Sequence, residues 1–192
     1  MLLDFTGGMF LAGLALLLLI LVLLRLRGRS WAGLFFTALF GLYLLVVVKT
    51  AIFPIHIPTA GQTGPEPFVP NINLVPFYSA CWPGRMCLRE MIGNVLLTLP
   101  FGFLLPFVAR FRARHILWLG PLVGLALEGT QLALSLALRS SFRAVDINDV
   151  LLNTLGVWLG YGLFSLFAWL YRLLERPLQG LLAHVSEVTR KH

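Results

Sequence analysis

Carboxylates, an amide and glycines recur at a helical spacing in the last third of the sequence. They are Asp146, Asp149, Asn153, Gly156 and Gly160, spaced three, four, three and four residues apart. This spacing predicts one face of a single helix, whose other residues are mostly apolar. Because ionised groups facing lipid are costly, the polar face must meet protein or water. Clustered carboxylates share protons or bind a cation, so we expect a functional site here.

The composition indicates a multi-pass membrane protein. The 192 residues are 58% hydrophobic and only 12% charged, whereas a soluble domain needs more polar residues to cover its surface. Apolar stretches near or above the roughly 18-residue length of a membrane span recur along the chain. The net charge of +7 comes from short basic clusters between these stretches. That distribution is typical of charges that set membrane orientation, and it argues against nucleic acid as a partner.

The apolar stretches predict an all-α integral membrane protein with five transmembrane helices, its N-terminus outside and its C-terminus cytoplasmic. The predicted spans are residues 5–24, 31–53, 90–108, 116–138 and 146–171 of a single membrane domain, 1–192. Ten of the fifteen Lys and Arg residues would then be cytoplasmic. Residues 54–89 hold seven of the eleven prolines, which predicts a long outer loop without regular helix. Apolar residues along one face of 177–190 predict a C-terminal amphipathic helix on the inner surface.

Two other predicted spans carry polar faces that could meet the polar face of the fifth span. The third span has Asn94, Thr98 and Gly102, and the fourth has Gly124, Glu128, Gln131 and Ser135. Converging polar faces predict an acidic cavity open to the outside, with a basic rim. The predicted ligand-binding residues are Asn94, Glu128, Gln131, Arg139, Arg143, Asp146, Asp149 and Asn153. The alternative is that the polar groups only hold the helices together through interhelical hydrogen bonds.

Metal and thiol chemistry are also possible. A cation held by Glu128, Asp146 and Asp149 would have oxygen ligands, which suit Mg²⁺, Ca²⁺ or Mn²⁺. The four histidines are scattered and give no zinc pattern. Cys81 and Cys87 lie in the predicted outer loop on the oxidising side of the membrane, which favours a disulfide between them. Two free thiols are the alternative.

Several motifs together resemble the VanZ-like family. They are Asn73-Leu-Val-Pro-Phe77, Asn94-x5-Pro100-Phe-Gly-x-Leu-Leu-Pro106, Glu128-x2-Gln131 and Arg143-x2-Asp146-x2-Asp149-x3-Asn153-x2-Gly156-x3-Gly160. They cover roughly residues 70 to 165, and their combined order is quite specific. The resemblance implies a small multi-pass protein of the bacterial cytoplasmic membrane. The family's namesake is associated with low-level resistance to the lipoglycopeptide teicoplanin, but the resemblance implies no particular reaction.

Two functions are therefore open. The first is a non-enzymatic envelope protein, in contact with membrane lipids, that binds a lipid-linked cell-wall precursor or a lipoglycopeptide in the acidic cavity. The second is a divalent-cation-dependent enzyme acting on a lipid-linked phosphate. In that enzyme Glu128, Asp146 and Asp149 would hold the metal, and Arg139 or Arg143 would bind phosphate. A proton-coupled transporter using Glu128 is a weaker hypothesis, because five spans show no inverted repeat.

The predicted topology can be tested directly. Reporter fusions after Arg29, Arg114 and Arg176 should all report a cytoplasmic location, because each position follows or lies within a basic cluster. A periplasmic signal from any of the three would contradict the five-span, N-out arrangement.

Overall fold

The computed structural model of the chain describes residues 2–56, 69–76, 85–139 and 144–190. Within these residues, five helices are long and apolar enough to cross a membrane. They are α1 Gly7–Leu26, α2 Trp31–Ile52, α3 Arg85–Val108, α4 Ile116–Leu138 and α5 Ile147–Arg190, and a 3₁₀ turn, η1 Ala113–His115, precedes α4. The predicted class, a helical multi-pass membrane protein, is confirmed at this level.

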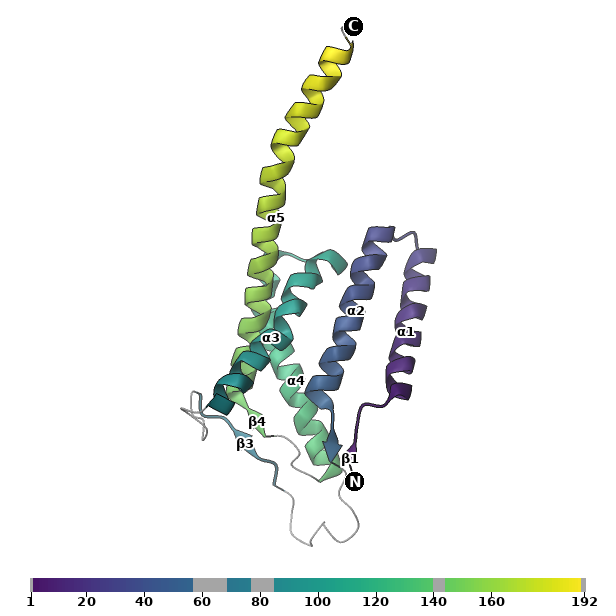
Figure 1. The fold of residues 1–192 in the computed structure, drawn as a ribbon. Helices are drawn as coiled ribbons and strands as arrows, with labels where there is room; N and C mark the ends of the chain where they lie inside the picture. Colours follow the sequence, from purple (N-terminus) through teal and green to yellow (C-terminus); the bar gives the residue numbers. More distant parts are fainter. Residues whose placement is uncertain (1, 57–68, 77–84, 140–143, 191–192) are drawn as a thin grey trace.

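The first two helices form a hairpin at the edge of the molecule. The Thr6 hydroxyl accepts a hydrogen bond from the Met9 amide at the start of α1, and the Ser30 hydroxyl accepts one from the Gly33 amide at the start of α2. Gly28, between them, has a φ of 81°, which a residue without a Cβ adopts at no steric cost. Every residue of α1 is at least partly exposed. The contacts of α1 are chiefly with α2 (Figure 1), so its leucine-rich surface is suited to lipid.

The other three helices form the packed centre, in which α5 lies against both α3 and α4. Glycines bring α3 and α5 into backbone contact. A Cβ added at Gly102 would lie 2.0 Å from the Val157 carbonyl oxygen, and one at Gly160 would lie 1.9 Å from the Leu99 carbonyl oxygen. On the other side of α5, a Cβ at Gly124 of α4 would lie 2.6 Å from the backbone oxygen of Val150. Small residues permit such close approach between membrane helices.

Two pairs of very short strands lie at one end of the bundle (Figure 1). Strand β1, Leu2–Leu3, pairs antiparallel with β2, Ile55–His56. Strand β3, Ile72–Asn73, pairs parallel with β4, Val145–Asp146, so that Asn73 is opposite Asp146. The second pair connects the segment before α3 to the start of α5.

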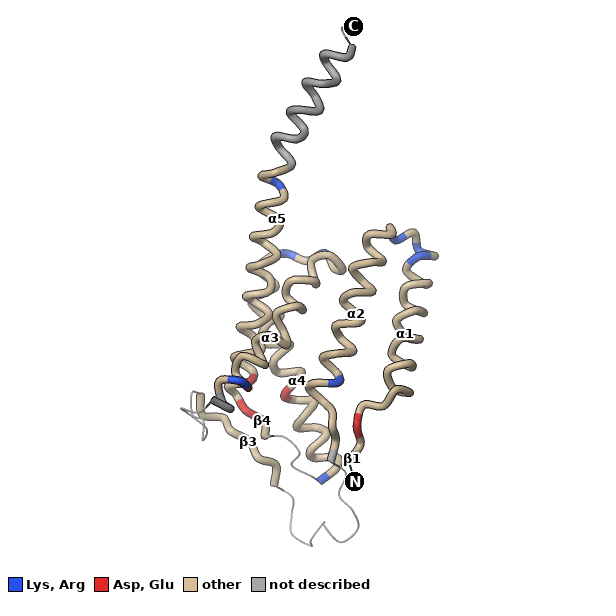
Figure 2. Tube along the Cα trace, in the orientation of Figure 1, with Lys and Arg blue, Asp and Glu red and all other residues tan. Residues whose placement is uncertain are grey.

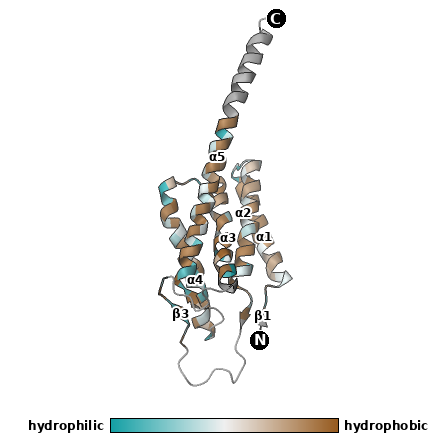
Figure 3. Cartoon of the chain, turned by 60° about the vertical axis from the view of Figure 1, so that its left-hand side comes forward, coloured by the Kyte–Doolittle hydropathy of each residue, from teal (hydrophilic) through white to brown (hydrophobic). Residues whose placement is uncertain are grey.

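The two ends of the bundle differ in charge. Arginines of the α1–α2 turn and of the α3–α4 connection lie at one end (Figure 2). The Asp and Glu positions coloured in that figure lie toward the end with the strands, where some Lys and Arg positions also lie. At the arginine-bearing end, Arg29 donates a 2.8 Å hydrogen bond from Nη2 to the Val108 carbonyl oxygen. The Arg25 guanidinium lies 4.6 Å from the Trp31 ring centroid. Hydrophobic residues cover most of the helix length between the two ends (Figure 3).

Some predicted boundaries differ from the structure. Asp146 belongs to β4 and precedes α5, although its spacing predicts a place on the helix. Helix α3 begins at Arg85, within the region predicted as loop, because a helix can start soon after a proline. The helix predicted separately over 177–190 is continuous with α5, since a proline removes only one helical hydrogen bond. Cys81, one partner of the predicted disulfide, and Arg143 lie outside the described residues.

The glycine contact between α3 and α5 predicts a position-specific effect on stability. Gly160→Ala should lower the free energy of unfolding by about 1–3 kcal/mol or more, because the new methyl group meets backbone that cannot move aside. Gly162→Ala is the matched control, since within the described residues its Cβ would meet nothing within 4 Å. Thermal unfolding of the purified protein in detergent should show a lower Tm for Gly160→Ala alone. Equal Tm values for the two variants would contradict the close packing.

Candidate functional site

Asp146 connects β3, β4 and the start of α5. Its Oδ1 accepts hydrogen bonds from the Asn148 amide nitrogen and from Asn148 Nδ2, both at 2.8 Å. The same oxygen accepts a 3.1 Å bond from Asn73 Nδ2. Because Asp146 is followed directly by Ile147, the bond to the Asn148 amide is that of a helix N-cap. Its negative charge is also favoured at the N-terminal end of the helix dipole.

Glu128 brings a second carboxylate to the same place from α4. The residue is only 4% exposed, and its Oε2 accepts a 3.1 Å hydrogen bond from the Asp146 amide nitrogen. A carboxylate in an apolar helix is tolerated where backbone donors meet it, and a helix N-terminus supplies such donors. Glu128 therefore lies beside the first turn of α5.

A third carboxylate, Asp149, lies in the first turn of α5 and is bound by α3. Asn94 donates a short hydrogen bond from its Nδ2 to Asp149 Oδ1. Both side chains are partly exposed, as is Asp146. We call Glu128, Asp146 and Asp149, with their partners Asn73, Asn94 and Asn148, the acid–amide cluster. Helices α3, α4 and α5 and both strands β3 and β4 contribute to it.

Asn153 lies one helical turn below Asp149 and is 2% exposed. Its backbone oxygen is 2.8 Å from the Thr98 hydroxyl, which is also 3.1 Å from the Asn94 carbonyl oxygen. The hydroxyl has one proton and donates to one of these oxygens at a time. The Asn153 side-chain oxygen, Oδ1, is buried and has no hydrogen-bond partner among the described residues. An unpaired buried acceptor is costly, so this oxygen is suited to receive a donor from a bound group or water.

Two other predicted site residues, Gln131 and Arg139, lie on α4 and directly after it. Gln131 donates a 3.0 Å hydrogen bond from Nε2 to the Ala51 carbonyl oxygen, and this bond ties α4 to the end of α2. Arg139 is exposed and follows α4 with a φ of 49°, in the left-handed region. Arg143 lies outside the described residues. Of the eight predicted ligand-binding residues, Asn94 contacts Asp149, and Glu128 contacts the backbone of Asp146. Asn153 lies one helical turn further along α5 from Asp149.

The architecture and the polar residues agree with a family assignment. A family model described as VanZ/LLP1 matches residues 40–168. The chain belongs to this family. The matched region covers α3, α4 and most of the membrane part of α5, and so it contains the whole acid–amide cluster. Comparison with curated proteins and with solved structures gave no match.

Two residues of this VanZ/LLP1 protein were not predicted to belong to the site. Asn148 occupies the second helical position after an aspartate, where an Asx turn commonly forms, and that pattern could have identified it. Asn73 is the first residue of one VanZ-like motif, but its contact with Asp146 joins residues 73 positions apart in the sequence. No periodicity within a single helix could reveal that contact.

The described residues of the VanZ/LLP1 protein do not include a group of three or more His, Cys, Asp or Glu side chains that could hold a metal ion. The donor arrangement gives a reason. Asp146 Oδ1 already accepts bonds from Asn148 and Asn73, and Glu128 Oε2 accepts one from backbone. These N–H groups occupy lone pairs that a cation would need.

The N-cap role of Asp146 predicts different effects for two substitutions. Asp146→Ala should destabilise the fold by about 0.5–2 kcal/mol, because it removes the acceptor for Asn148 and Asn73. Asp146→Asn keeps a side-chain oxygen at the cap, so its stability should be close to that of the unmodified protein. Thermal unfolding in detergent measures both. A loss for Asp146→Asn as large as that for Asp146→Ala would contradict the capping role.

Proposed function

We propose that this VanZ/LLP1 protein is a non-enzymatic envelope protein that binds the polar head of a lipid-tailed ligand at the acid–amide cluster. The head would be rich in N–H or O–H donors, as in a lipid-linked cell-wall precursor or a lipoglycopeptide. The observation that carries the proposal is the gathering of three carboxylates, Glu128, Asp146 and Asp149, at one end of an otherwise apolar bundle. Ionisable groups within the apolar part of a membrane protein are typically functional.

The hydrogen bonds within the cluster support binding of a donor-rich group. Amide and backbone N–H groups fix the orientation of each carboxylate, so little side-chain entropy is lost when a ligand arrives. Asp146, Asp149 and Asn94 are partly exposed, which gives a ligand access from the end of the bundle. Below them, Asn153 Oδ1 is an acceptor without a partner in the described part of the chain.

The charge distribution supports an outward-facing site in the bacterial cytoplasmic membrane. Cytoplasmic loops of membrane proteins carry an excess of Lys and Arg. The arginines of the α1–α2 turn and of the α3–α4 connection lie at the end of the bundle opposite to the acid–amide cluster (Figure 2). With the arginines inside, the cluster faces the outer leaflet, where cell-wall precursors are used and lipoglycopeptides arrive.

The metal-dependent enzyme is the second candidate, and it is less favoured. It requires the carboxylate oxygens to be free for a cation, whereas Asp146 Oδ1 and Glu128 Oε2 accept protein hydrogen bonds. The two functions separate in one assay. Turnover of a polyprenyl phosphate by the purified protein, abolished by a chelator, would support the enzyme and contradict the binding function.

Removal of one cluster charge should abolish the function without unfolding the protein. Asp149→Asn keeps the shape of the side chain and one oxygen for Asn94, but removes the charge that strengthens bonds to a donor ligand. Charge-assisted hydrogen bonds contribute about 1.5–3 kcal/mol, so ligand affinity should fall about tenfold or more. In a susceptible bacterium expressing the protein, the minimum inhibitory concentration of teicoplanin should fall to that of the empty-vector strain.

Asp4→Asn is the matched control for this experiment. It makes the same chemical change at an exposed aspartate toward the same end of the bundle, where Asp4 caps its own neighbour, Phe5. The control should keep full resistance, and membrane levels of both variants should equal those of the unmodified protein. Full resistance in the Asp149→Asn strain would mean that the cluster only holds helices together.

A further inference from the structure

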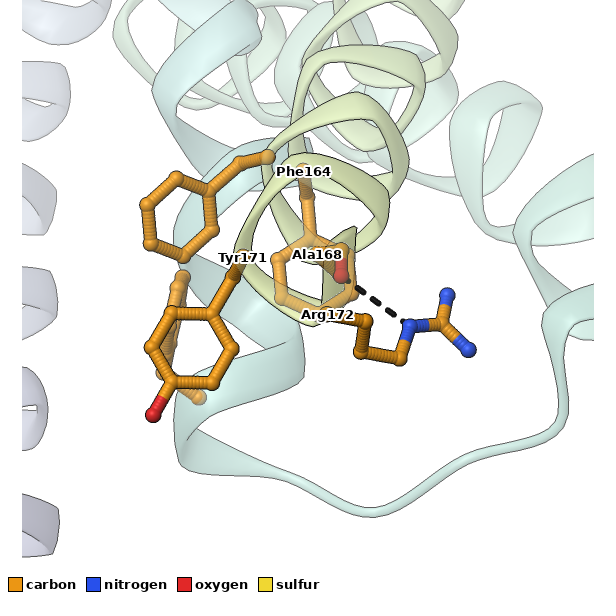
Figure 4. A pocket seen from close by; sticks show the side chains of 6 residues that line it. Phe164, Ala168, Tyr171 and Arg172 are labelled. Atoms are coloured by element: carbon orange, nitrogen blue, oxygen red, sulfur yellow. Dashed lines mark hydrogen bonds between the residues drawn. The ribbon is translucent and has the colours of Figure 1, made fainter. Parts of the chain in front are cut away.

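A second feature with the character of a ligand site lies at the arginine-bearing end, remote from the acid–amide cluster. An open groove of about 410 Å³ runs between the end of α3 and α5 (Figure 4). Its lining residues are Phe107, Phe164, Phe167, Ala168, Tyr171 and Arg172. This volume falls within the range of about 300–1,000 Å³ that is typical of sites for small organic ligands.

The walls of the groove are aromatic, and the protein holds them in place. The Phe107 ring stacks on Phe36 of α2 with centroids 4.2 Å apart, and it meets Phe164 edge-on at 5.1 Å. The carbonyl oxygens of Phe107 and Val108 both accept hydrogen bonds from Arg29. Phe107 is therefore fixed by α2 and by the α1–α2 turn, and the groove exists before any ligand binds. Its apolar surface suits a hydrocarbon chain.

Arg172 places a cation at the edge of these rings. Its Nε donates a 3.0 Å hydrogen bond to the Ala168 carbonyl oxygen, which holds the side chain against its own helix. Figure 4 shows the guanidinium pointing away from the labelled rings, with its two terminal nitrogens directed outward. Within the described residues, no group accepts a hydrogen bond from these terminal nitrogens. A planar guanidinium with free donors matches the oxygens of a phosphate.

The depth of the groove corresponds to the boundary between lipid tails and headgroups. Helix α3 ends at Val108, one residue after Phe107, and the exposed arginines Arg110, Arg112 and Arg114 follow directly. The Asp and Glu positions coloured red in Figure 2 lie toward the opposite end. Basic pockets between helices at this level recognise anionic lipid headgroups.

We propose that this groove is a binding site for an anionic phospholipid, with one acyl chain along the aromatic walls and the phosphate on Arg172. The aromatic walls recognise the chain, Arg172 recognises the phosphate, and the neighbouring arginines select a net negative headgroup over a zwitterionic one. The site is independent of the proposed function, because it lies at the other membrane face and uses cationic instead of acidic groups.

Native mass spectrometry of the purified full-length protein tests the site. The protein in detergent is titrated with phosphatidylglycerol and, separately, with phosphatidylcholine of the same acyl chains. Phosphatidylglycerol should bind more tightly, and Arg172→Gln should weaken it by about fivefold, the effect of one interfacial arginine. Arg27→Gln removes the same charge from an exposed residue of the α1–α2 turn and should change binding much less.

The apolar half of the site has its own pair of variants. Ala168→Phe fills the groove while leaving Arg172 in place, so it should reduce binding of phosphatidylglycerol. Leu166→Phe enlarges an exposed residue outside the groove and should leave the binding of phosphatidylglycerol unchanged. Equal affinity for the two lipids, equal losses in Arg172→Gln and Arg27→Gln, or unchanged binding in Ala168→Phe would each overturn the proposal. Tm values of the four variants in detergent identify any that unfold, and the remaining pair then decides.

Discussion

The backbone contact between α3 and α5 is the constraint on which the rest of the structure depends. Side chains larger than hydrogen cannot fit at Gly102, Gly156 or Gly160, because a Cβ would fall within 2.5 Å of a neighbouring oxygen atom. Three glycines along one interface fix both the separation of the helices and their register. With that register, Asn94 meets Asp149, and one turn further Thr98 meets the backbone of Asn153. The packing of small residues thus determines which polar groups meet.

A second level of organisation comes from the start of α5. An unsatisfied helix N-terminus inside a membrane protein needs acceptors for its first amides. Asp146 caps the helix, and Glu128 of α4 accepts the amide of Asp146 itself. The parallel pairing of Asn73 with Asp146 then brings the segment before α3 to the same place. The carboxylates that cap α5 are therefore also members of the candidate site. Asp146, before the first residue of α5, and Asp149, within its first turn, both belong to the site for this reason.

The sequence predicts the parts of this arrangement that periodicity can reveal. Apolar length identifies the five spans, and the spacing of Asp149, Asn153 and Gly156 identifies the face that meets α3. Periodicity does not reveal where a helix begins, so Asp146 reads as a helical residue although it is a cap in β4. It also cannot reveal a two-residue strand pair whose members lie 73 positions apart, because nothing local to Asn73 specifies its partner. The spacing of residues within α4 also cannot reveal that the Gln131 amide donates to the Ala51 carbonyl oxygen at the end of α2.

The charges at the two ends are placed where the helices themselves stabilise them. Glu128, Asp146 and Asp149 surround the N-terminus of α5, which carries the positive end of its dipole. Arg29 donates to the last carbonyl oxygens of α3, at a negative end, and Arg25 lies in the last turn of α1. The same charges that orient a membrane protein therefore also stabilise its helix ends. The two proposed sites therefore differ in the charge of the side chains that define them: carboxylates at the acid–amide cluster and a guanidinium at the groove. A donor-rich or cationic head suits the acid–amide cluster, and an anionic head suits the groove at Arg172.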